Sequence, residues 1–243
     1  MKKTLIALAM AAVSLPALAQ QKAPAPDYTM SANVSLVSDY RFRGITQASK
    51  KPALQGGFDF AHKGGLYLGN WNSSIDWVSK YNYGESSGIE SDLYVGYKAD
   101  VGGISLDIGA VAYTYAGTGI NSNVPTNEVY VGLGYGPLSF KTFFTTSEGY
   151  FSYAGRGTIY YSLGLSFPVS ETVSLKGSYG YTAGKEAVAA YKGSDYSVGV
   201  AVDLGDGWSL GLNYVAASGD YKSFSSVAAD GDGGAVISIS RSF

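Results

Sequence analysis

The stretch ESDLYVGYKADVGGISLDIGAVAY, residues 90–113, contains two segments of alternating side chains joined by a short glycine-containing turn. In the first segment Leu93, Val95 and Tyr97 alternate with polar and charged residues, and the second segment repeats the pattern from Ile104. Successive side chains of a strand point to opposite faces. The stretch therefore predicts an antiparallel hairpin with one apolar and one polar face.

The same alternation runs through most of the chain, and helical periodicity is hard to find. It predicts strands at about residues 31–43, 53–61 and 66–76, in addition to the two in the quoted stretch. Seven later segments continue it: NEVYVGLGY, SFKTFFT, TIYYSLGLSF, VSLKGSYGY, YSVGVAVDL, WSLGLNYV and AVISISRSF. The total is about twelve strands, an even number.

The connections between these segments alternate in length. HKGG (62–65), DVGG (100–103), Gly136-Pro137, PVSET (168–172) and LGDG (204–207) are short. The intervening connections are longer and rich in Gly, Ser, Asn and Ala. This asymmetry is typical of outer-membrane barrels, which have short periplasmic turns and longer extracellular loops. It predicts an all-β fold: one antiparallel, up-and-down transmembrane β-barrel, with twelve strands as the expected number.

The N-terminus predicts export. Residues 1–19 have two lysines, an apolar run and a small-residue pattern before Gln20, which is typical of a secretory signal peptide cleaved near Ala19. Residues 20–30 are expected to form a flexible lead-in, and residues 31–243 the barrel. The predicted location is the outer membrane of a Gram-negative bacterium.

The composition excludes several classes of function. With 46% hydrophobic residues in alternating order, the chain is not expected to be disordered. It has no cysteine, one histidine (His62) and a formal net charge of −2, which argues against disulfide scaffolds, thiolate metal sites and nucleic-acid binding. We expect no metal, no cofactor and no catalytic residue.

A secreted soluble β-sandwich or barrel would also alternate. The membrane interpretation is favoured because aromatic residues recur near the ends of the apolar faces, where interfacial girdles lie. The candidates for this girdle are Tyr40, Phe42, Phe60, Tyr97, Tyr135, Phe167, Tyr181, Trp208 and Tyr214. We also expect Tyr67 and Trp71 on the apolar face.

SDYRFRGITQ (38–47), followed by KPALQGGFDFAHKGGLYLGNWNSSID (51–76), resembles the N-terminal signature of the TorF family of porin-like proteins. The resemblance covers about residues 31–76 and implies an outer-membrane β-barrel with a channel role. It assigns neither a substrate nor functional residues. In addition, ISISRSF (237–243) resembles the aromatic-terminated last strand of bacterial outer-membrane proteins. That resemblance implies outer-membrane lipid and the barrel-assembly machinery as partners, with Phe243 as the terminal signal.

Twelve strands give a backbone diameter of about 24 Å and a lumen of roughly 10–12 Å before any loop folds inward. The parity of each strand assigns charged side chains of both signs to this lumen. The pore-lining candidates are Asp39, Arg41, Arg43, Asp59, Asp76, Glu90, Asp92, Lys98, Asp107, Glu128, Lys141, Lys176 and Asp203. Such charges can select ions, or they can pair across the lumen and fill it.

We expect strand 31–43 to carry Arg41 and Arg43 to the pore mouth, where they pair with Asp59 or Asp76. The predicted function is a porin-like channel for small solutes or ions, with a weak cation preference. The alternatives are a plugged structural or adhesive barrel acting through its outer loops and, less favoured, an outer-membrane hydrolase. The sequence leaves the oligomeric state open.

Overall fold

Twelve antiparallel strands close into a barrel in the computed structural model, which describes residues 26–183, 193–218 and 231–243. The number of strands predicted from the sequence is confirmed. In chain order the barrel strands are β1 (Tyr28–Val37), β4 (Ala53–His62), β5 (Leu66–Ser74), β6 (Glu85–Val101), β7 (Ile104–Thr118), β8 (Thr126–Tyr135), β9 (Leu138–Thr145), β12 (Ile159–Pro168), β13 (Val173–Ala183), β14 (Gly193–Gly205), β15 (Trp208–Ser218) and β16 (Gly234–Ser242).

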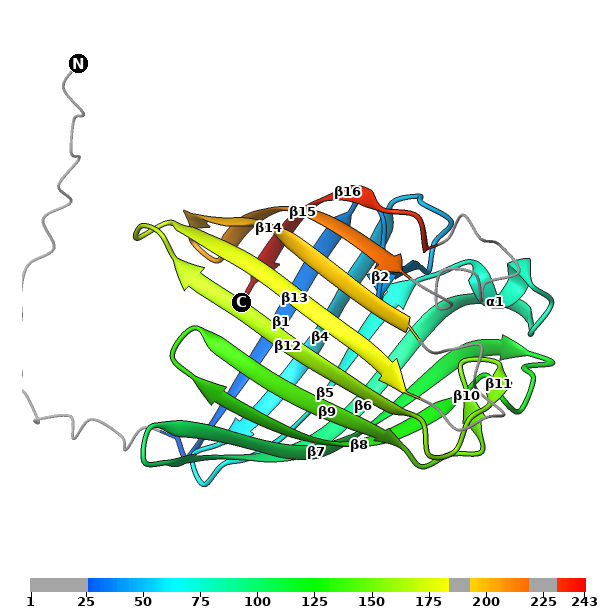
Figure 1. The fold of residues 1–243 in the computed structure, drawn as a ribbon, viewed down its shortest axis with the longest axis horizontal. Helices are drawn as coiled ribbons and strands as arrows, with labels where there is room; N and C mark the ends of the chain where they lie inside the picture. Colours follow the sequence, from blue (N-terminus) through cyan, green and yellow to red (C-terminus); the bar gives the residue numbers. More distant parts are fainter. Residues whose placement is uncertain (1–25, 184–192, 219–230) are drawn as a thin grey trace, which may run out of the picture.

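The first and last strands close the barrel (Figure 1). β1 pairs with β16 in a register that places Asn33 opposite Ser242 and Val37 opposite Ser238. The backbone of Phe243 continues this pairing, since its N–H donates to the carbonyl of Ala32 at 2.9 Å. Closure leaves none of the twelve barrel strands with an unpaired edge.

Short turns lie at one end of the barrel and longer connections at the other, as predicted (Figure 1). At the turn between β6 and β7, Gly102 and Gly103 have φ angles of +63° and +84°, which glycine adopts without steric cost. The opposite end carries helix α1 (Trp77–Lys80) and two short strands, β10 (Gly149–Tyr150) and β11 (Tyr153–Ala154). No helix among the described residues is long and apolar enough to span a membrane.

The first expected strand is shorter than predicted and begins earlier. β1 starts at Tyr28, inside the expected lead-in, and ends at Val37 instead of continuing to Arg43. The chain then forms a small hairpin from β2 (Arg41–Phe42) and β3 (Ile45–Thr46). Its two turn residues, Arg43 and Gly44, both have positive φ angles, +46° and +82°, as tight two-residue hairpins require. We call residues 38–47 the inward hairpin.

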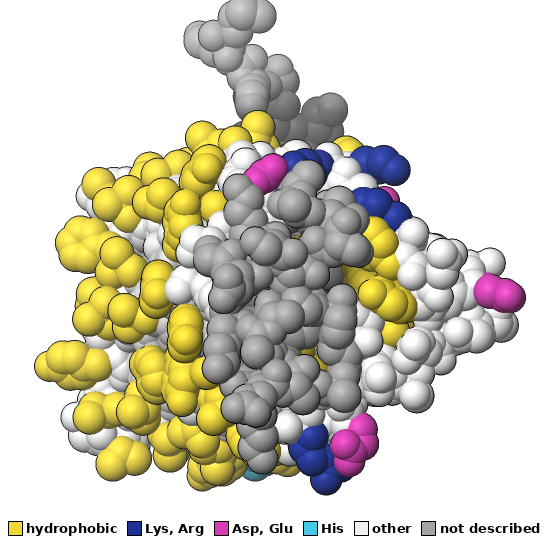
Figure 2. All heavy atoms as spheres, turned by 45° about the vertical axis from the view of Figure 1, so that its right-hand side comes forward, with side chains coloured by type: hydrophobic (Ala, Val, Ile, Leu, Met, Phe, Trp, Pro, Cys, Tyr) yellow, Lys and Arg dark blue, Asp and Glu magenta, His cyan; other side chains and the backbone are white. Residues whose placement is uncertain are grey.

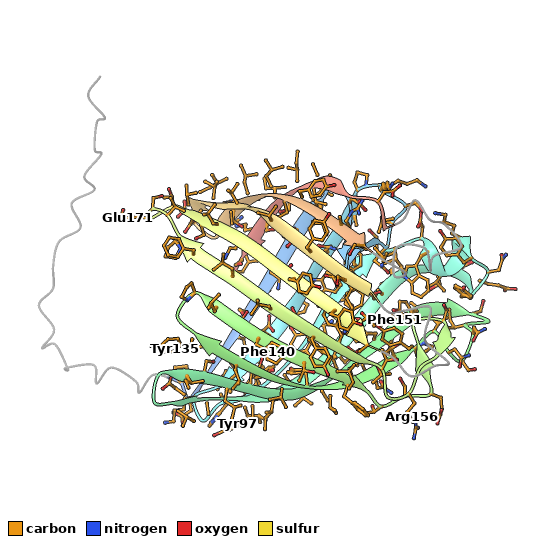
Figure 3. The ribbon with its side chains drawn as sticks, viewed as in Figure 1. Tyr97, Tyr135, Phe140, Phe151, Arg156 and Glu171 are labelled. Carbon is orange, nitrogen blue, oxygen red and sulfur yellow. The ribbon has the colours of Figure 1, made fainter. Side chains whose placement is uncertain are left out.

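The outward face of the barrel is apolar. Large side chains on it are widely exposed, including Phe58 (65%), Val198 (62%) and Ile237 (58%). In Figure 2 hydrophobic side chains cover the left side of the molecule, and in Figure 3 Tyr97, Tyr135 and Phe140 lie toward the turn end. A continuous apolar exterior on a closed barrel is typical of barrels surrounded by lipid, and a soluble protein rarely exposes one.

Candidate functional site: a lumen narrowed by the inward hairpin

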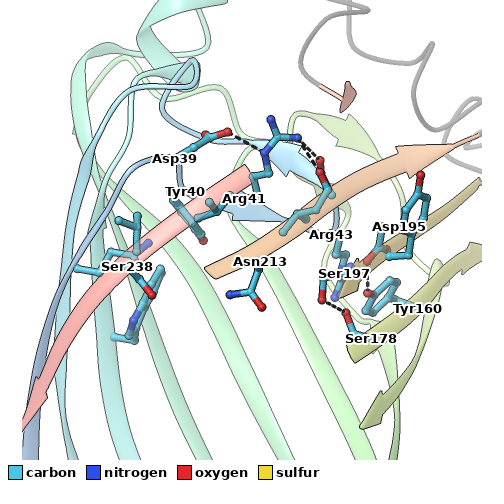
Figure 4. A pocket seen from close by; sticks show the side chains of 17 residues that line it. Asp39, Tyr40, Arg41, Arg43, Tyr160, Ser178, Asp195, Ser197, Asn213 and Ser238 are labelled. Carbon is cyan, nitrogen blue, oxygen red and sulfur yellow. Dashed lines mark hydrogen bonds and ion pairs between the residues drawn. The ribbon is translucent and has the colours of Figure 1, made fainter. Parts of the chain in front are cut away.

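The inward hairpin folds into the barrel instead of extending its wall (Figure 4). Asp39, Tyr40 and Arg43 are at most 7% exposed, and Thr46 is 2% exposed. The hairpin contacts β6 and β8 on one side of the barrel and β14 and β15 on another. It therefore narrows the lumen near the loop end.

The tip of the hairpin is held by an ion pair with β8. Arg43 donates through Nη2 to Oε2 of Glu128 at 2.6 Å and through Nη1 to Oε1 at 3.1 Å. Both side chains are almost completely buried, with 3% of the arginine and none of the carboxylate exposed. Burial alone would lower the pKa of Arg43, but the Glu128 carboxylate outweighs it and raises that pKa well above its usual range. A fixed positive charge thus lies inside the barrel, neutralised by its partner.

Aromatic rings enclose the Arg43 guanidinium. Its central carbon lies 4.0 Å from the ring centre of Tyr160 and 4.8 Å from that of Phe42. Phe143, Phe151 and Tyr150 lie at 5.4, 5.8 and 5.9 Å. These contacts are within the range of cation–π attraction, so the rings hold the guanidinium in place in addition to Glu128.

The second arginine of the hairpin is held differently. Arg41 donates through Nε to Oδ2 of Asp39 at 2.7 Å and through Nη1 to the carbonyl of Asp232 at 2.6 Å. The hydroxyl of Thr46 donates to the other oxygen of Asp39. The ion pair therefore lies within the hairpin, and the Asp232 contact links the hairpin to the connection before β16.

Two further contacts attach the hairpin to the barrel wall. The hydroxyl of Tyr40 donates to Oε1 of Glu90 on β6 at 2.6 Å, and its ring meets Trp71 edge-on at 5.2 Å. Burial raises the pKa of this hydroxyl well above its usual value, and Glu90 raises it further, so Tyr40 stays protonated and donates. At the tip, a Cβ on Gly44 would lie 2.9 Å from the Ala216 carbonyl oxygen. Only glycine fits there without displacing the backbone.

A cavity of about 460 Å³ remains in the lumen beside the hairpin. On the side of β13 to β16 its lining includes the small polar residues Ser178, Ser197, Asn213 and Ser238, beside Val215 and Val236 (Figure 4). The remaining lining includes Asp195 and aromatic side chains. The cavity is thus polar and water-compatible.

The wall formed by β5 to β9 carries larger side chains than the wall beside the cavity. Asp107 accepts from the hydroxyl of Tyr67 at 2.6 Å and from Nζ of Lys141 at 2.7 Å. The Lys141 ammonium also lies 4.4 Å from the ring centre of Tyr130. This network fills part of the lumen, so the remaining space lies off-centre, toward β13 to β16.

The predicted pore-lining residues have several different environments. The expected pairing of Arg41 and Arg43 with Asp59 or Asp76 is wrong, because their partners are Asp39 and Glu128. Asp59 instead accepts from the hydroxyl of Tyr94. Asp76 lies beyond β5, where it precedes α1 and accepts from Ser49, so it is not part of the barrel wall.

The other candidates lie on the inward face of their strands. Asp92 is 8% exposed, and within the described residues its Oδ1 has no hydrogen-bond partner. Lys98 lies 4.8 Å from the Tyr67 ring centre, and Lys176 donates to Ser166 at 2.6 Å. Asp203 is exposed and accepts from the backbone N–H of Gly205 at the end of β14.

The girdle prediction is wrong for Tyr40 and Phe42, which lie inside the barrel against Glu90 and the Arg43 cluster. The separate expectation that Tyr67 and Trp71 lie on the apolar, outward face is also wrong, because Tyr67 contacts Asp107 and Trp71 contacts Tyr40. Exposure and strand alternation place the remaining candidates on the outward face: Phe60, Tyr97, Tyr135, Phe167, Tyr181, Trp208 and Tyr214.

Sequence reasoning missed Asp195 and the inward tyrosines. Asp195 is 6% exposed, and its Oδ1 accepts from the hydroxyl of Tyr160 at 3.1 Å. Tyr113 and Thr145 surround the Glu128 carboxylate with further hydrogen bonds. The alternation in YSVGVAVDL begins at Tyr196, and extending its parity back by one residue would have assigned Asp195 to the inward face.

Comparison with solved structures identifies membrane barrels of the same fold. A structure described as "KdgM porin in complex with disordered oligogalacturonate" matches with a TM-score of 0.53 and 8% identity, over 88% of this chain and 97% of that chain. One described as "Unveiling the Mechanism Behind the in-meso Crystallization of Membrane Proteins" matches with a TM-score of 0.51 and 11% identity, over 88% of this chain and 83% of that one. At such identities the likeness establishes the fold alone.

Sequence comparison identifies the family of the chain. The profile of a family described as "Bacterial protein of unknown function (Gcw_chp)" matches residues 21–243. Among curated protein sequences, none matches the chain.

Proposed function

The chain belongs to the Gcw_chp family of bacterial proteins of unknown function, and we propose that it is an outer-membrane channel for passive passage of small solutes or ions. The observation that carries the proposal is a closed barrel with an apolar exterior and a polar cavity in its lumen. An apolar exterior suits lipid, and a polar interior suits water and dissolved solutes.

The location is part of this proposal. Export through the signal peptide predicted over residues 1–19, which lies outside the described residues, would deliver the chain to the periplasm. The C-terminal strand ending at Phe243 would then be recognised by the barrel-assembly machinery. The resemblance to the TorF family of porin-like proteins supports the same function.

The inward hairpin would set the size limit of the channel. Passage would follow the side of the lumen lined by Ser178, Ser197, Asn213 and Ser238, since the opposite wall is filled by the Asp107 network. Neutral hydroxyl and amide groups on that path can replace part of the hydration shell of a solute.

Conductance of the refolded mature chain in planar bilayers tests the proposal. We expect small, discrete conductance steps from protein whose migration on gels changes on heating, as a folded barrel requires. If such folded protein gives no conductance, the channel proposal is wrong.

A plugged structural or adhesive barrel is the second candidate, and one observation favours it. The inward hairpin is attached to both sides of the lumen, through Arg43 to β8 and through Gly44 against β15. In that case, removing the attachment would open a conductance that the natural protein lacks.

We propose no enzymatic activity for the barrel. His62 lies at the end of β4, where its Nδ1 accepts from the backbone N–H of Gly64 at 3.0 Å. A nucleophile activated by histidine needs a hydroxyl within hydrogen-bond reach of the ring. If the purified protein showed phospholipase or protease activity, and His62→Ala abolished that activity, the proposal of a non-enzymatic barrel would be wrong.

A further inference from the structure

Asp195 has an unusual position in the lumen. It lies on β14, lines the cavity and is only 6% exposed. Its Oδ1 accepts from Tyr160, whereas its Oδ2 is buried and has no hydrogen-bond partner among the described residues. A buried carboxylate oxygen without a partner is unfavourable, so a donor from a bound molecule would stabilise it.

The cations beside the cavity are already neutralised. Arg41 pairs with Asp39 at 2.7 Å, and Arg43 pairs with both oxygens of Glu128. The Nε of Arg43 has no acceptor among the described residues, but the aromatic rings enclose its guanidinium. Neither arginine therefore presents an unpaired charge to an anion in the cavity.

The charge of Asp195 is not neutralised by an ion pair within the described residues. The two ion pairs cancel, which leaves the charge of Asp195 beside the cavity. A carboxylate in a low-dielectric lumen creates a negative potential that attracts cations.

The other lining groups suit a ligand that donates hydrogen bonds. Ser178, Ser197 and Asn213 offer oxygen acceptors, and Trp71 offers an aromatic edge or face. We propose that the cavity binds a small organic cation, of the primary ammonium or guanidinium class, with Asp195 as the residue that determines its specificity. This deepens the channel proposal and rests on it only for the claim that such cations also permeate.

Binding can be tested without conductance. The reporter is Trp71, which lines the cavity, in full-length mature protein carrying Trp77→Phe and Trp208→Phe. The probes are propylammonium chloride and sodium propionate, which have similar size and opposite charge. We expect saturable fluorescence changes with propylammonium and none with propionate.

The matched variants are Asp195→Asn and Asp203→Asn, because Asp203 lies on the same strand but is exposed at the turn end. Asp195→Asn should weaken propylammonium binding about tenfold or more, since hydrogen bonds to charged groups are stronger than those between neutral groups. Asp203→Asn should leave it unchanged. Equal binding of both probes to the reporter protein, or unchanged affinity in Asp195→Asn, would overturn the proposal.

Reversal potentials in a potassium chloride gradient test permeation separately. We expect cation selectivity in the natural protein and a shift toward no selectivity in Asp195→Asn. Anion selectivity would overturn the role of Asp195 in permeation while leaving a channel. Absence of conductance would instead reject the channel, and the fluorescence result would still decide whether the cavity binds cations.

Discussion

Arg43 and Glu128 form a two-pronged ion pair inside the barrel, with Nη2–Oε2 and Nη1–Oε1 distances of 2.6 and 3.1 Å. The two residues are 85 positions apart in the sequence. The pair links the tip of the inward hairpin to β8, so the width of the lumen depends on it.

Glu128→Gln should release the hairpin. Removing one partner leaves an uncompensated buried charge, which typically costs about 3–5 kcal/mol. We expect a lower free energy of unfolding in urea and a larger, noisier single-channel conductance.

The Arg156–Glu148 pair is the control for that change, because both side chains are mainly exposed, at 61% and 78%. Glu148→Gln should change the free energy of unfolding by less than about 1 kcal/mol. Equal effects of the two substitutions would contradict the role assigned to the buried pair.

Gly44→Ala should displace the hairpin tip for two reasons. The position has a φ of +82°, and a Cβ there would lie 2.9 Å from both the Ala216 carbonyl oxygen and Cβ of Asp195. We expect the free energy of unfolding to fall by more than the roughly 1–2 kcal/mol that a left-handed backbone costs a residue with a Cβ. We also expect the conductance to change.

Gly136→Ala separates the two causes, since Gly136 has a φ of +56° but no atom within 4 Å of its Cβ position. The Gly136→Ala variant should lose only the free energy that the left-handed backbone costs, and its conductance should equal that of the natural protein. If it matched Gly44→Ala in both measurements, close packing of the hairpin tip would not be the cause.

Tyr40→Phe should destabilise the barrel although it removes a single oxygen. Glu90 is 3% exposed, and the lost hydrogen bond would leave its carboxylate without that donor. The expected cost is about 1–3 kcal/mol, measured by urea unfolding. Tyr97→Phe is the control, because Tyr97 is 45% exposed on the outward face and should be close to neutral.

Trp71 and Trp208 should report opposite faces of the wall. In single-tryptophan variants, brominated lipids should quench Trp208, which is 39% exposed and points outward. Trp71 packs against Tyr40 inside the barrel and should not be quenched. Quenching of both would place Trp71 on the outward face and remove the support for the inward hairpin.

The strand between residues 66 and 74 illustrates the limit of alternation. Tyr67 and Trp71 were expected to face outward because they are aromatic, yet they point inward and the alternate positions Asn70 and Asn72 point outward. The side-chain amide of Asn72 donates to the backbone of the neighbouring strand at 3.3 Å, which satisfies one of its polar groups. Tyrosine and tryptophan have both an apolar body and a polar group, so residue type alone does not decide their face.

Alternation and turn length by themselves determined the barrel: its strand number, its five short turns and the outward face of most strands. Both signals are local, because the period of a strand and the chemistry of a tight turn depend on adjacent residues. The inward hairpin was decided by the tertiary structure. Residues 38–47 alternate as well as any wall strand, and only the distant partners Glu128, Glu90 and Ala216 make the inward position favourable. The cavity, and the Asp195 oxygen that has no hydrogen-bond partner among the described residues, follow from that long-range packing, which no local pattern encodes.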